Sequence, residues 1–202
     1  IGHWAFYNCT SLSSVVIPEG VTEIPKGAFE ECENLASIII PKSVTKIGNR
    51  AFFNCSSLSS VVIPESVTEI GREAFWNCKF TSIVIPEGVT EIPYRAFEHC
   101  NSLASIIIPK SVTKIGERAF YNCSLSSIVI PESVKSIGGR AFMDCTGLTS
   151  ITIPESVEYI GSRVFSGCTG LTSITLPESV TSIGECAFSG CTGLTSITLP
   201  ES

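Results

Sequence analysis

The stretch "CTGLTSITLPES" occupies Cys168–Ser179 and again Cys191–Ser202, and Cys145–Ser156 differs from it only at Ile153. The three copies begin at Cys145, Cys168 and Cys191, so the phrase recurs at a constant interval. A phrase that recurs at a fixed period is the sequence signature of a repeat architecture, in which each repeat forms one structural unit. We therefore expect the rest of the chain to follow the same period.

The repeat extends over the whole chain. Alignment on the motif I-G-x-x-A-F gives nine units with a period of about 23 residues, and two of them are one residue shorter than the others. The units begin at Ile1, Ile24, Ile47, Ile70, Ile92, Ile115, Ile137, Ile160 and Ile183. No linker separates them, so we predict a single solenoid domain over residues 1–202. Both ends are cut inside a repeat without a polar capping unit, so we expect the array to be truncated at both ends.

Hydrophobic periodicity divides each unit into segments. Leu148–Pro154 alternates apolar and polar residues, which is typical of a strand with one solvated face, and the proline ends it. The V-T-x-I segment predicts a second extended stretch. In A-F-x-x-C, the spacing of Ala141, Phe142 and Cys145 predicts a short helical turn. Phenylalanine recurs in all nine units, so stacked units should enclose a continuous column of rings.

The combined consensus L-x-S-I-x-I-P-x-S-V-T-x-I-G-x-x-A-F-x-x-C resembles the BspA-like family of leucine-rich repeats over all nine units. The resemblance implies a right-handed leucine-rich-repeat superhelix. Its parallel β-sheet would lie on the concave face, with short helical turns and extended segments on the other sides. The resemblance also implies a cell-surface or secreted protein that adheres to host or matrix proteins.

Composition argues against two classes of function. The chain carries 13 basic and 19 acidic residues, a net charge of −6, whereas nucleic-acid binders need a dense cationic surface. Its longest runs of strongly apolar residues are three residues long, far short of a membrane-spanning segment. We therefore expect no nucleic-acid partner and no membrane insertion.

The sequence contains no recognisable catalytic or cofactor motif. The only histidines, His3 and His99, occupy different positions of different units, and no serine or acid recurs beside them. Neither a dinucleotide-binding nor a phosphate-loop motif occurs. We predict a protein that is not an enzyme, with no catalytic residues, no metal and no cofactor.

The cysteines form a column. They recur once per unit, which differs from the close pairs of zinc sites. The pattern allows two interpretations: buried thiols that pack as small apolar groups, or disulfides between neighbouring units. Cys186 falls outside the column and is predicted to be exposed. The column consists of Cys9, Cys32, Cys55, Cys78, Cys100, Cys123, Cys145, Cys168 and Cys191.

One row of residues is the first candidate binding site. It lies between the two inward isoleucines of each strand, so it should point out of the sheet. A contiguous apolar row on a solvated face can mark a partner site, although valine, isoleucine and threonine also simply favour strands. We call it the central row: Val16, Ile39, Val62, Val84, Ile107, Val129, Thr152, Thr175 and Thr198.

A second candidate is the arginine column. Stacked like charges repel, so an anionic partner would relieve them. Alternatively, the arginines form a solvated edge paired with local acids such as Glu98 or Asp144. The column comprises Arg95, Arg118, Arg140 and Arg163 on four successive units, and Arg50 lies two units before Arg95.

A longer period is superimposed on the repeat. The residues after each strand proline begin Glu, Lys, Glu, Glu, Lys, Glu, and Pro25 recurs as Pro93 three units later, which indicates a duplicated three-unit cassette. The last residues of the units follow the same order: Glu23, Lys46, Glu69, Glu91 and Lys114. Placing Lys42 between Glu19 and Glu65 avoids like-charge neighbours in a ladder, whereas the simpler interpretation is a solvated face whose pairs contribute little. Three N-x-[ST] sequons, at Asn8, Asn54 and Asn122, arise wherever the repeat places asparagine before cysteine.

Two functions fit these observations. One is a non-enzymatic module that binds protein ligands along the sheet. The other is a structural spacer that projects another domain, which the near-identical last units favour because a stalk needs no position-specific surface. Uncapped ends also suggest end-to-end self-association.

Overall fold

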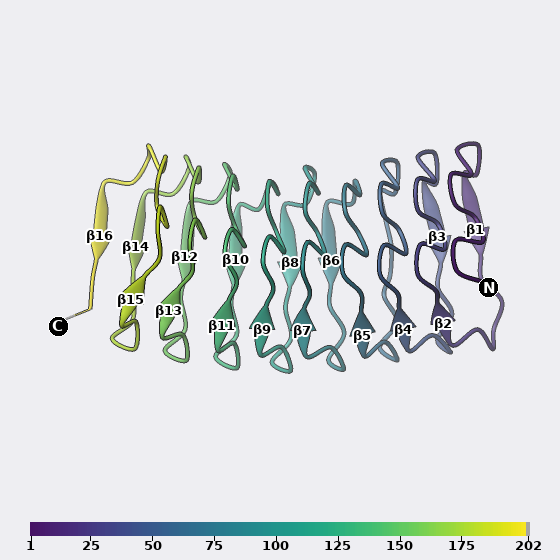
Figure 1. Ribbon diagram of the computed structural model, residues 1–202, viewed down its shortest axis with the longest axis horizontal. Helices are drawn as coiled ribbons and strands as arrows, with labels where there is room; N and C mark the ends of the chain where they lie inside the picture. The colour runs from purple at the N-terminus through teal and green to yellow at the C-terminus, as the bar shows by residue number, and fades with distance from the viewer. Residues whose placement is uncertain (201–202) are drawn as a thin grey trace.

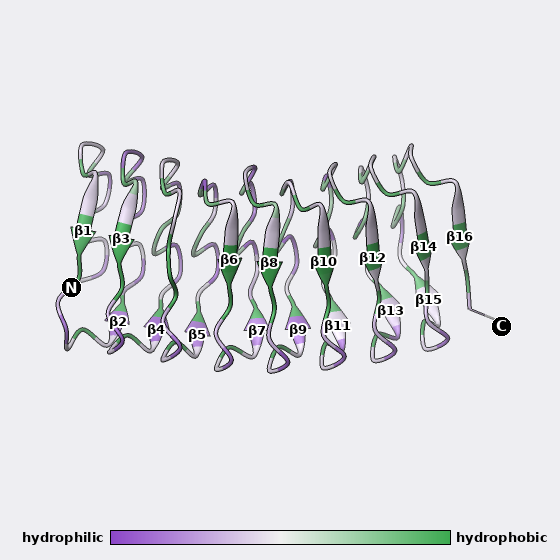
Figure 2. Cartoon of the chain, turned by 180° about the vertical axis from the view of Figure 1, so that it is seen from behind, coloured by the Kyte–Doolittle hydropathy of each residue, from purple (hydrophilic) through white to green (hydrophobic). Residues whose placement is uncertain are grey.

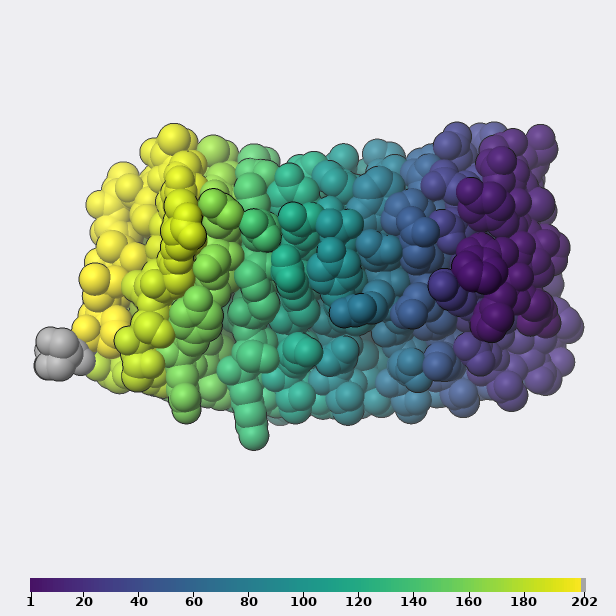
Figure 3. Space-filling model, in the orientation of Figure 1, coloured from purple at the N-terminus to yellow at the C-terminus, as the bar shows by residue number. Residues whose placement is uncertain are grey.

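The computed structural model describes residues 1–200, and these residues form a solenoid of parallel strands. The coils follow one another in sequence order along the long axis, so the two termini lie at opposite ends (Figures 1 and 3). This confirms the predicted fold class. We number the coils 1 to 9 in the order of the sequence units.

The longer strands form one side of the solenoid. Their residues pair in parallel in the register of the repeat, so that Val16 lies opposite Ile39 and Val84 opposite Ile107. In the six strands between the first and the last, the middle residue is buried and its neighbours are exposed, which gives the alternation that the sequence predicts. In the first strand the middle residue is partly buried, and in the last it is exposed. These strands are β1 (Ser14–Val16), β3 (Ser37–Ile39), β6 (Ser82–Val84), β8 (Ser105–Ile107), β10 (Ser127–Val129), β12 (Ser150–Thr152), β14 (Ser173–Thr175) and β16 (Ser196–Thr198).

Shorter strands of two residues form a second parallel row, on the V-T-x-I segment. In each, the isoleucine faces the interior, and Glu23, Lys46 and Glu69 lie opposite one another on the outside. Opposite charges therefore alternate along this part of the ladder, as the cassette pattern predicts. These strands are β2 (Glu23–Ile24), β4 (Lys46–Ile47), β5 (Glu69–Ile70), β7 (Glu91–Ile92), β9 (Lys114–Ile115), β11 (Ser136–Ile137), β13 (Tyr159–Ile160) and β15 (Ser182–Ile183).

The longer-strand row is not one continuous ladder. Its strands pair as β1–β3, β6–β8, β10–β12 and β14–β16, and coil 3 contributes only a bridge from Ser60 to Ser37. Two of the interruptions fall where the repeat is one residue short, from Val62 to Val84 and from Ile107 to Val129, and we call these the short steps. A third lies between β12 and β14, where the repeat has its full length, so the missing residue is not the sole cause.

The phenylalanine column forms the predicted internal stack. Successive rings from Phe6 to Phe188 have centroids 5.1–5.7 Å apart and planes within 15° of parallel. In the first short unit, Phe80 replaces the usual leucine and packs edge-on against Phe75 and Phe97, at 5.9 and 6.2 Å. The larger ring thus fills the interior where the loop is one residue shorter. Figure 2 shows apolar colouring that recurs from coil to coil.

The prediction of short helical turns in the A-F-x-x-C segments is wrong. These segments consist of successive β-turns, for example Ala51 N–H to Gly48 C=O and Cys55 N–H to Phe52 C=O. Arg50 and Asn54 adopt left-handed backbone angles, with φ of 57° and 56°, and a right-handed helix contains no such residues. Alternate N–H groups, those of Arg50, Phe52 and Asn54, donate to the next coil instead of along a helix. Alanine, phenylalanine and cysteine face inward all the same.

Glycine after the first isoleucine of a unit permits close approach between coils. A Cβ added to Gly71 would lie 2.3 Å from the backbone nitrogen of Asn49 and 2.4 Å from the carbonyl carbon of Gly48. Both are backbone atoms, so a clash there cannot be relieved by rotating a side chain. This explains the glycine of the I-G motif.

We expect Gly71→Ala to lower the free energy of unfolding by about 1–3 kcal/mol, because the coils must separate to admit the methyl group. Chemical denaturation followed by circular dichroism measures this loss. Gly2→Ala is the matched control, since a Cβ at Gly2 would have no neighbour within 4 Å. Equal stability of the Gly71 variant and the wild type would contradict the close approach.

Candidate binding surface

Every described residue of the central row points away from the interior. The six apolar members are 52–80% exposed, and the three threonines are exposed as well. In most coils the inward neighbours on either side of the row residue, such as Ile83 and Ile85 beside Val84, are buried in the core; Val15 and Val61 are only partly buried, and Ile197 and Leu199 of the last coil are exposed. The row therefore lies on the solvent side of the longer strands. Its first six members form a contiguous exposed apolar line.

Two polar rows border the central row. A serine begins each longer strand and is exposed, as at Ser37 and Ser82. On the other border, after the strand proline, lies a second exposed row, which we call the glutamate–lysine row. It comprises Glu19, Lys42, Glu65, Glu87, Lys110, Glu132, Glu155 and Glu178. An apolar centre with a polar rim is the usual anatomy of a protein interface.

The sheet surface is hollowed where the ladder is interrupted at the short steps. At the first short step, a hollow of about 490 Å³ extends from coil 2 to coil 4 and one of about 420 Å³ lies between coils 3 and 4; they share Val61, Val62 and Ser82 as lining residues. Between coils 5 and 6, a hollow of about 310 Å³ is lined by residues that include Ile107 and Val129. The apolar part of the central row thus contains two depressions.

The larger depression has a cause that the repeat consensus does not predict. Val61 occupies an inward strand position that is isoleucine in every other coil except coil 1, and it is partly exposed, whereas Ile83 and Ile106 in the same position are buried. A valine lacks one methylene group of an isoleucine, and Val61 lines both hollows of the larger depression. An alignment of the strand positions of the nine units would have been enough to identify Val61 as a departure from the repeat.

The arginine column is paired with carboxylates from the same coil and from neighbouring coils. Arg50 contacts Glu30 at 2.8 Å and Glu73 at 3.1 Å. Arg95 contacts Glu73 at 3.4 Å and Glu98 at 3.1 Å. These contacts join into a chain of alternating charges over coils 2 to 5, on the side of the turns.

The remaining arginines of the column are also near carboxylates. Glu117 lies 3.9 Å from Arg118 and 3.4 Å from Arg140, and Arg163 lies 3.5 Å from Glu185. Repulsion between stacked arginines is therefore relieved within the chain. This geometry favours the ion-paired edge over an anionic partner as the explanation of the column.

Glu30 and Glu98 are the two buried acids among the described residues, and they occupy equivalent positions three coils apart. The three-unit repeat of the cassette is the sequence signal that could have identified these two acids as equivalent. Burial raises the pKa of Glu98, although the charge of Arg95 opposes that rise. Burial also lowers the pKa of His99, 3.6 Å away. Both shifts disfavour the charged forms, which weakens an ion pair between Glu98 and His99.

The column cysteines of the described interior are free thiols. Each donates its S–H to the phenylalanine carbonyl of the preceding coil, as Cys55 does to Phe29 at 3.1 Å and Cys100 to Phe75 at 3.1 Å. Burial raises the pKa of Cys100 and of Cys145 to about 12. The thiols are therefore structural hydrogen-bond donors, and the interpretation as a disulfide ladder is not supported. Cys186 is exposed, as predicted.

The sequon asparagines occupy left-handed turn positions. Asn8, Asn54 and Asn122 have φ of 55–56°, a conformation that asparagine tolerates better than most residues. The amide nitrogen of Asn54 donates to Glu31 Oε2 at 2.6 Å, and its oxygen accepts from Asn77 at 2.6 Å. The turn conformation accounts for asparagine here without any glycan.

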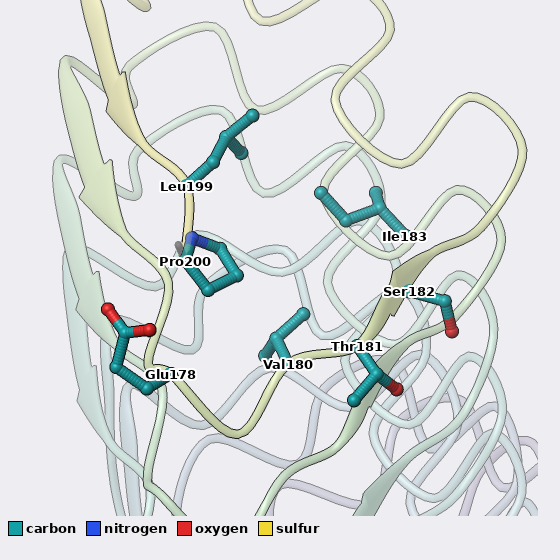
Figure 4. Close-up of a pocket in the computed structure, with 7 residues that line it drawn as sticks. All are labelled: Glu178, Val180, Thr181, Ser182, Ile183, Leu199 and Pro200. Carbon is teal, nitrogen blue, oxygen red and sulfur yellow. The ribbon is translucent and has the colours of Figure 1, made fainter. Parts of the chain in front are cut away.

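A further hollow, of about 510 Å³, lies at the last coil (Figure 4). Val180, Ile183 and Leu199 line it, and they occupy inward positions that the following coil covers elsewhere in the array. The hollow is thus a stacking surface of the repeat, and end-to-end self-association through such surfaces stays a prediction.

Within residues 1–200, no three or more histidine, cysteine, aspartate or glutamate side chains are grouped so as to hold a metal ion. No helix in this part of the chain has the length and hydropathy needed to cross a membrane.

The repeat region matches the BspA-type leucine-rich repeat model in overlapping segments, residues 1–103, 22–149 and 90–202. The chain belongs to the BspA-type leucine-rich repeat family. The sequence resemblance is thereby confirmed. The comparison with curated proteins returned no match.

Solved structures of bacterial proteins share this architecture. A leucine-rich cell-surface protein from Faecalibacterium prausnitzii is 35% identical, with a TM-score of 0.75 over 94% of this chain and 61% of its own. A leucine-rich repeat protein from T. pallidum is 34% identical, with a TM-score of 0.64 over 92% of this chain and 79% of its own. The chain thus spans about three-fifths of the length of the first of these proteins.

Proposed function

We propose that this BspA-type repeat domain is a non-enzymatic protein-binding module of a cell-surface or secreted protein, which adheres to host or matrix proteins through the exposed face of its longer strands. The observation that carries the proposal is the contiguous exposed line of six apolar residues in coils 1–6, from Val16 to Val129. Isolated exposed apolar residues are ordinary on protein surfaces, but a continuous row with a polar rim is typical of an interface. The surface location is supported by the likeness to the F. prausnitzii cell-surface protein.

A spacer role is the second candidate, and the last three coils favour it. There the central row changes to Thr152, Thr175 and Thr198, and the phrase CTGLTSIT is identical in the three coils. A stalk needs no position-specific surface. The two roles are compatible within one chain, with recognition in coils 1–6 and spacing in coils 7–9.

The threonines of coils 7–9 suggest a conservative substitution that tests the central row. Threonine occupies the central row in coils 7–9 without disturbing the fold, so Val62→Thr, Val84→Thr, Ile107→Thr and Val129→Thr together should leave the solenoid intact. We expect this fourfold variant to bind at least tenfold more weakly to whichever protein the wild type retains from a panel of immobilised, purified matrix proteins. The loss follows from removal of apolar contact area at the centre of the interface.

The reverse change is the matched control. Thr152→Val with Thr175→Val lengthens the apolar line and should leave binding unchanged or stronger. Biolayer interferometry measures all three proteins, and circular dichroism verifies their folds. Equal affinity of the fourfold variant and the wild type would exclude the central row as the site, and no retained protein at all would favour the spacer.

A further inference from the structure

The hollow between coils 3 and 4 is the most distinctive feature of the exposed sheet face. It lies at the first of the two short steps, where the ladder between Val62 and Val84 is absent. Its two parts have volumes of about 490 and 420 Å³, and the larger one also reaches Ile38–Ile40 on coil 2. The part confined to coils 3 and 4, of about 420 Å³, is larger than the hollow of about 310 Å³ at the second short step. The repeat is one residue short at both steps. The missing residue therefore does not explain why the first hollow is larger than the second.

The inward residue at the two steps accounts for that difference. At the first step it is Val61, which is partly exposed and packs against the core from the side of the hollow. At the second step the corresponding residues, Ile106 and Ile128, are buried. A partner side chain that enters the first hollow therefore meets Val61 as its floor and Val62 and Val84 as its walls.

The rim of the same hollow is acidic. Glu65 lines the hollow, and Glu87 occupies the same row on the next coil. Within coils 1–6 this is the one place where two glutamates of the glutamate–lysine row are neighbours, since lysine separates them elsewhere. Neither carboxylate has an ion-pair partner among residues 1–200. A positive charge on a partner would complement this doublet.

We infer that the hollow is the anchor point for one type of partner: a peptide segment that carries a bulky apolar residue next to a lysine or arginine. The apolar side chain fills the space above Val61, and the cation lies against Glu65 and Glu87. Buried apolar anchors with charged neighbours at the rim are typical of the residues that dominate binding energy in protein interfaces. This inference rests on the proposed function and specifies which chemistry the sheet face recognises.

The test selects ligands without assuming their sequence. A random dodecapeptide library displayed on phage is panned against the wild-type domain. We expect enriched peptides to contain leucine, phenylalanine or tryptophan within two positions of a basic residue. Synthetic copies of the enriched peptides should bind at least tenfold more weakly to Val61→Ile, which restores the residue used in the other coils. They should bind at least fivefold more weakly to the double variant Glu65→Gln/Glu87→Gln.

Val15→Ile is the matched control, because it makes the same change at the same strand position in coil 1. It should bind the peptides as the wild type does. The inference is overturned if no peptide is enriched, if the enriched peptides lack the apolar–basic pair, or if Val61→Ile binds them with wild-type affinity.

The fourfold threonine variant and Val61→Ile together separate this inference from the proposed function. If the fourfold threonine variant loses its matrix protein while Val61→Ile binds peptides normally, the central row stands and the anchor hollow does not. If the fourfold variant keeps its matrix protein, the proposed function itself fails.

Discussion

Replacing Phe97 with alanine is expected to lower the free energy of unfolding by about 3–5 kcal/mol. The Phe97 ring is fully buried, and its centroid lies 5.6 Å from those of both Phe75 and Phe120. It also supports the edge of Phe80. Alanine would leave a cavity in the middle of the stack, where neighbouring coils cannot collapse without breaking their own contacts.

That loss is a large share of the roughly 5–15 kcal/mol typical of a folded domain, so the array should separate into two cooperative parts near coil 5. Urea denaturation followed by circular dichroism would measure it. Phe53→Ala is the control, because Phe53 lies outside the stack and is only partly buried. Similar small losses for both variants would contradict the internal stack.

The buried thiols predict a steep loss of stability in alkali. In the unfolded chain a thiol titrates near pH 8.5, while burial raises the pKa of the six most enclosed thiols well above that value. Below pH 8.5 both states are protonated and the shift has no effect. Above it, the unfolded chain loses protons that the folded chain keeps, so the unfolded state is favoured. The six are Cys55, Cys78, Cys100, Cys123, Cys145 and Cys168.

Each such thiol lowers the free energy of unfolding by about 1.4 kcal/mol per pH unit above pH 8.5, which for all six is about 8 kcal/mol per unit. We expect cooperative unfolding near pH 10, measured by circular dichroism during titration. Iodoacetamide at pH 8 provides the control: Cys9 and Cys186 are exposed and should react, while these six should not until the chain unfolds. Constant stability from pH 8.5 to 10, or reaction of all ten cysteines in the folded protein, would contradict the burial.

The repeat period predicted most of the fold because each unit places the same residue in the same surroundings. Phe97 recurs in one column, so its contacts with Phe75 and Phe120 follow once the coils are stacked. The conformation of the A-F-x-x-C segment could not be predicted in this way. The spacing of Ala141, Phe142 and Cys145 fits a helical turn equally well, whereas the actual turns depend on left-handed residues such as Arg140.

The candidate surface was predictable to the extent that it follows the repeat. Alternation along the strand was enough to place Val62 and Val84 on the outside. The hollow depends instead on departures from the repeat, namely Val61 in place of isoleucine and the residue missing near Phe80. Likewise, the pairing of Arg50 with Glu30 depends on how far each side chain extends toward the neighbouring coil. A repeat consensus does not contain that information.

The most direct test of the stacked solenoid is a nuclear Overhauser experiment on protein that is protonated only at phenylalanine in a deuterated background. The central claim is that every coil places its phenylalanine ring against the next and so leaves the central row outside. We predict inter-ring cross-peaks linking consecutive members of the column, including Phe75 to Phe97 and Phe97 to Phe120, whose centroids are 5.6 Å apart. Absence of cross-peaks between these rings in the folded protein would contradict the account.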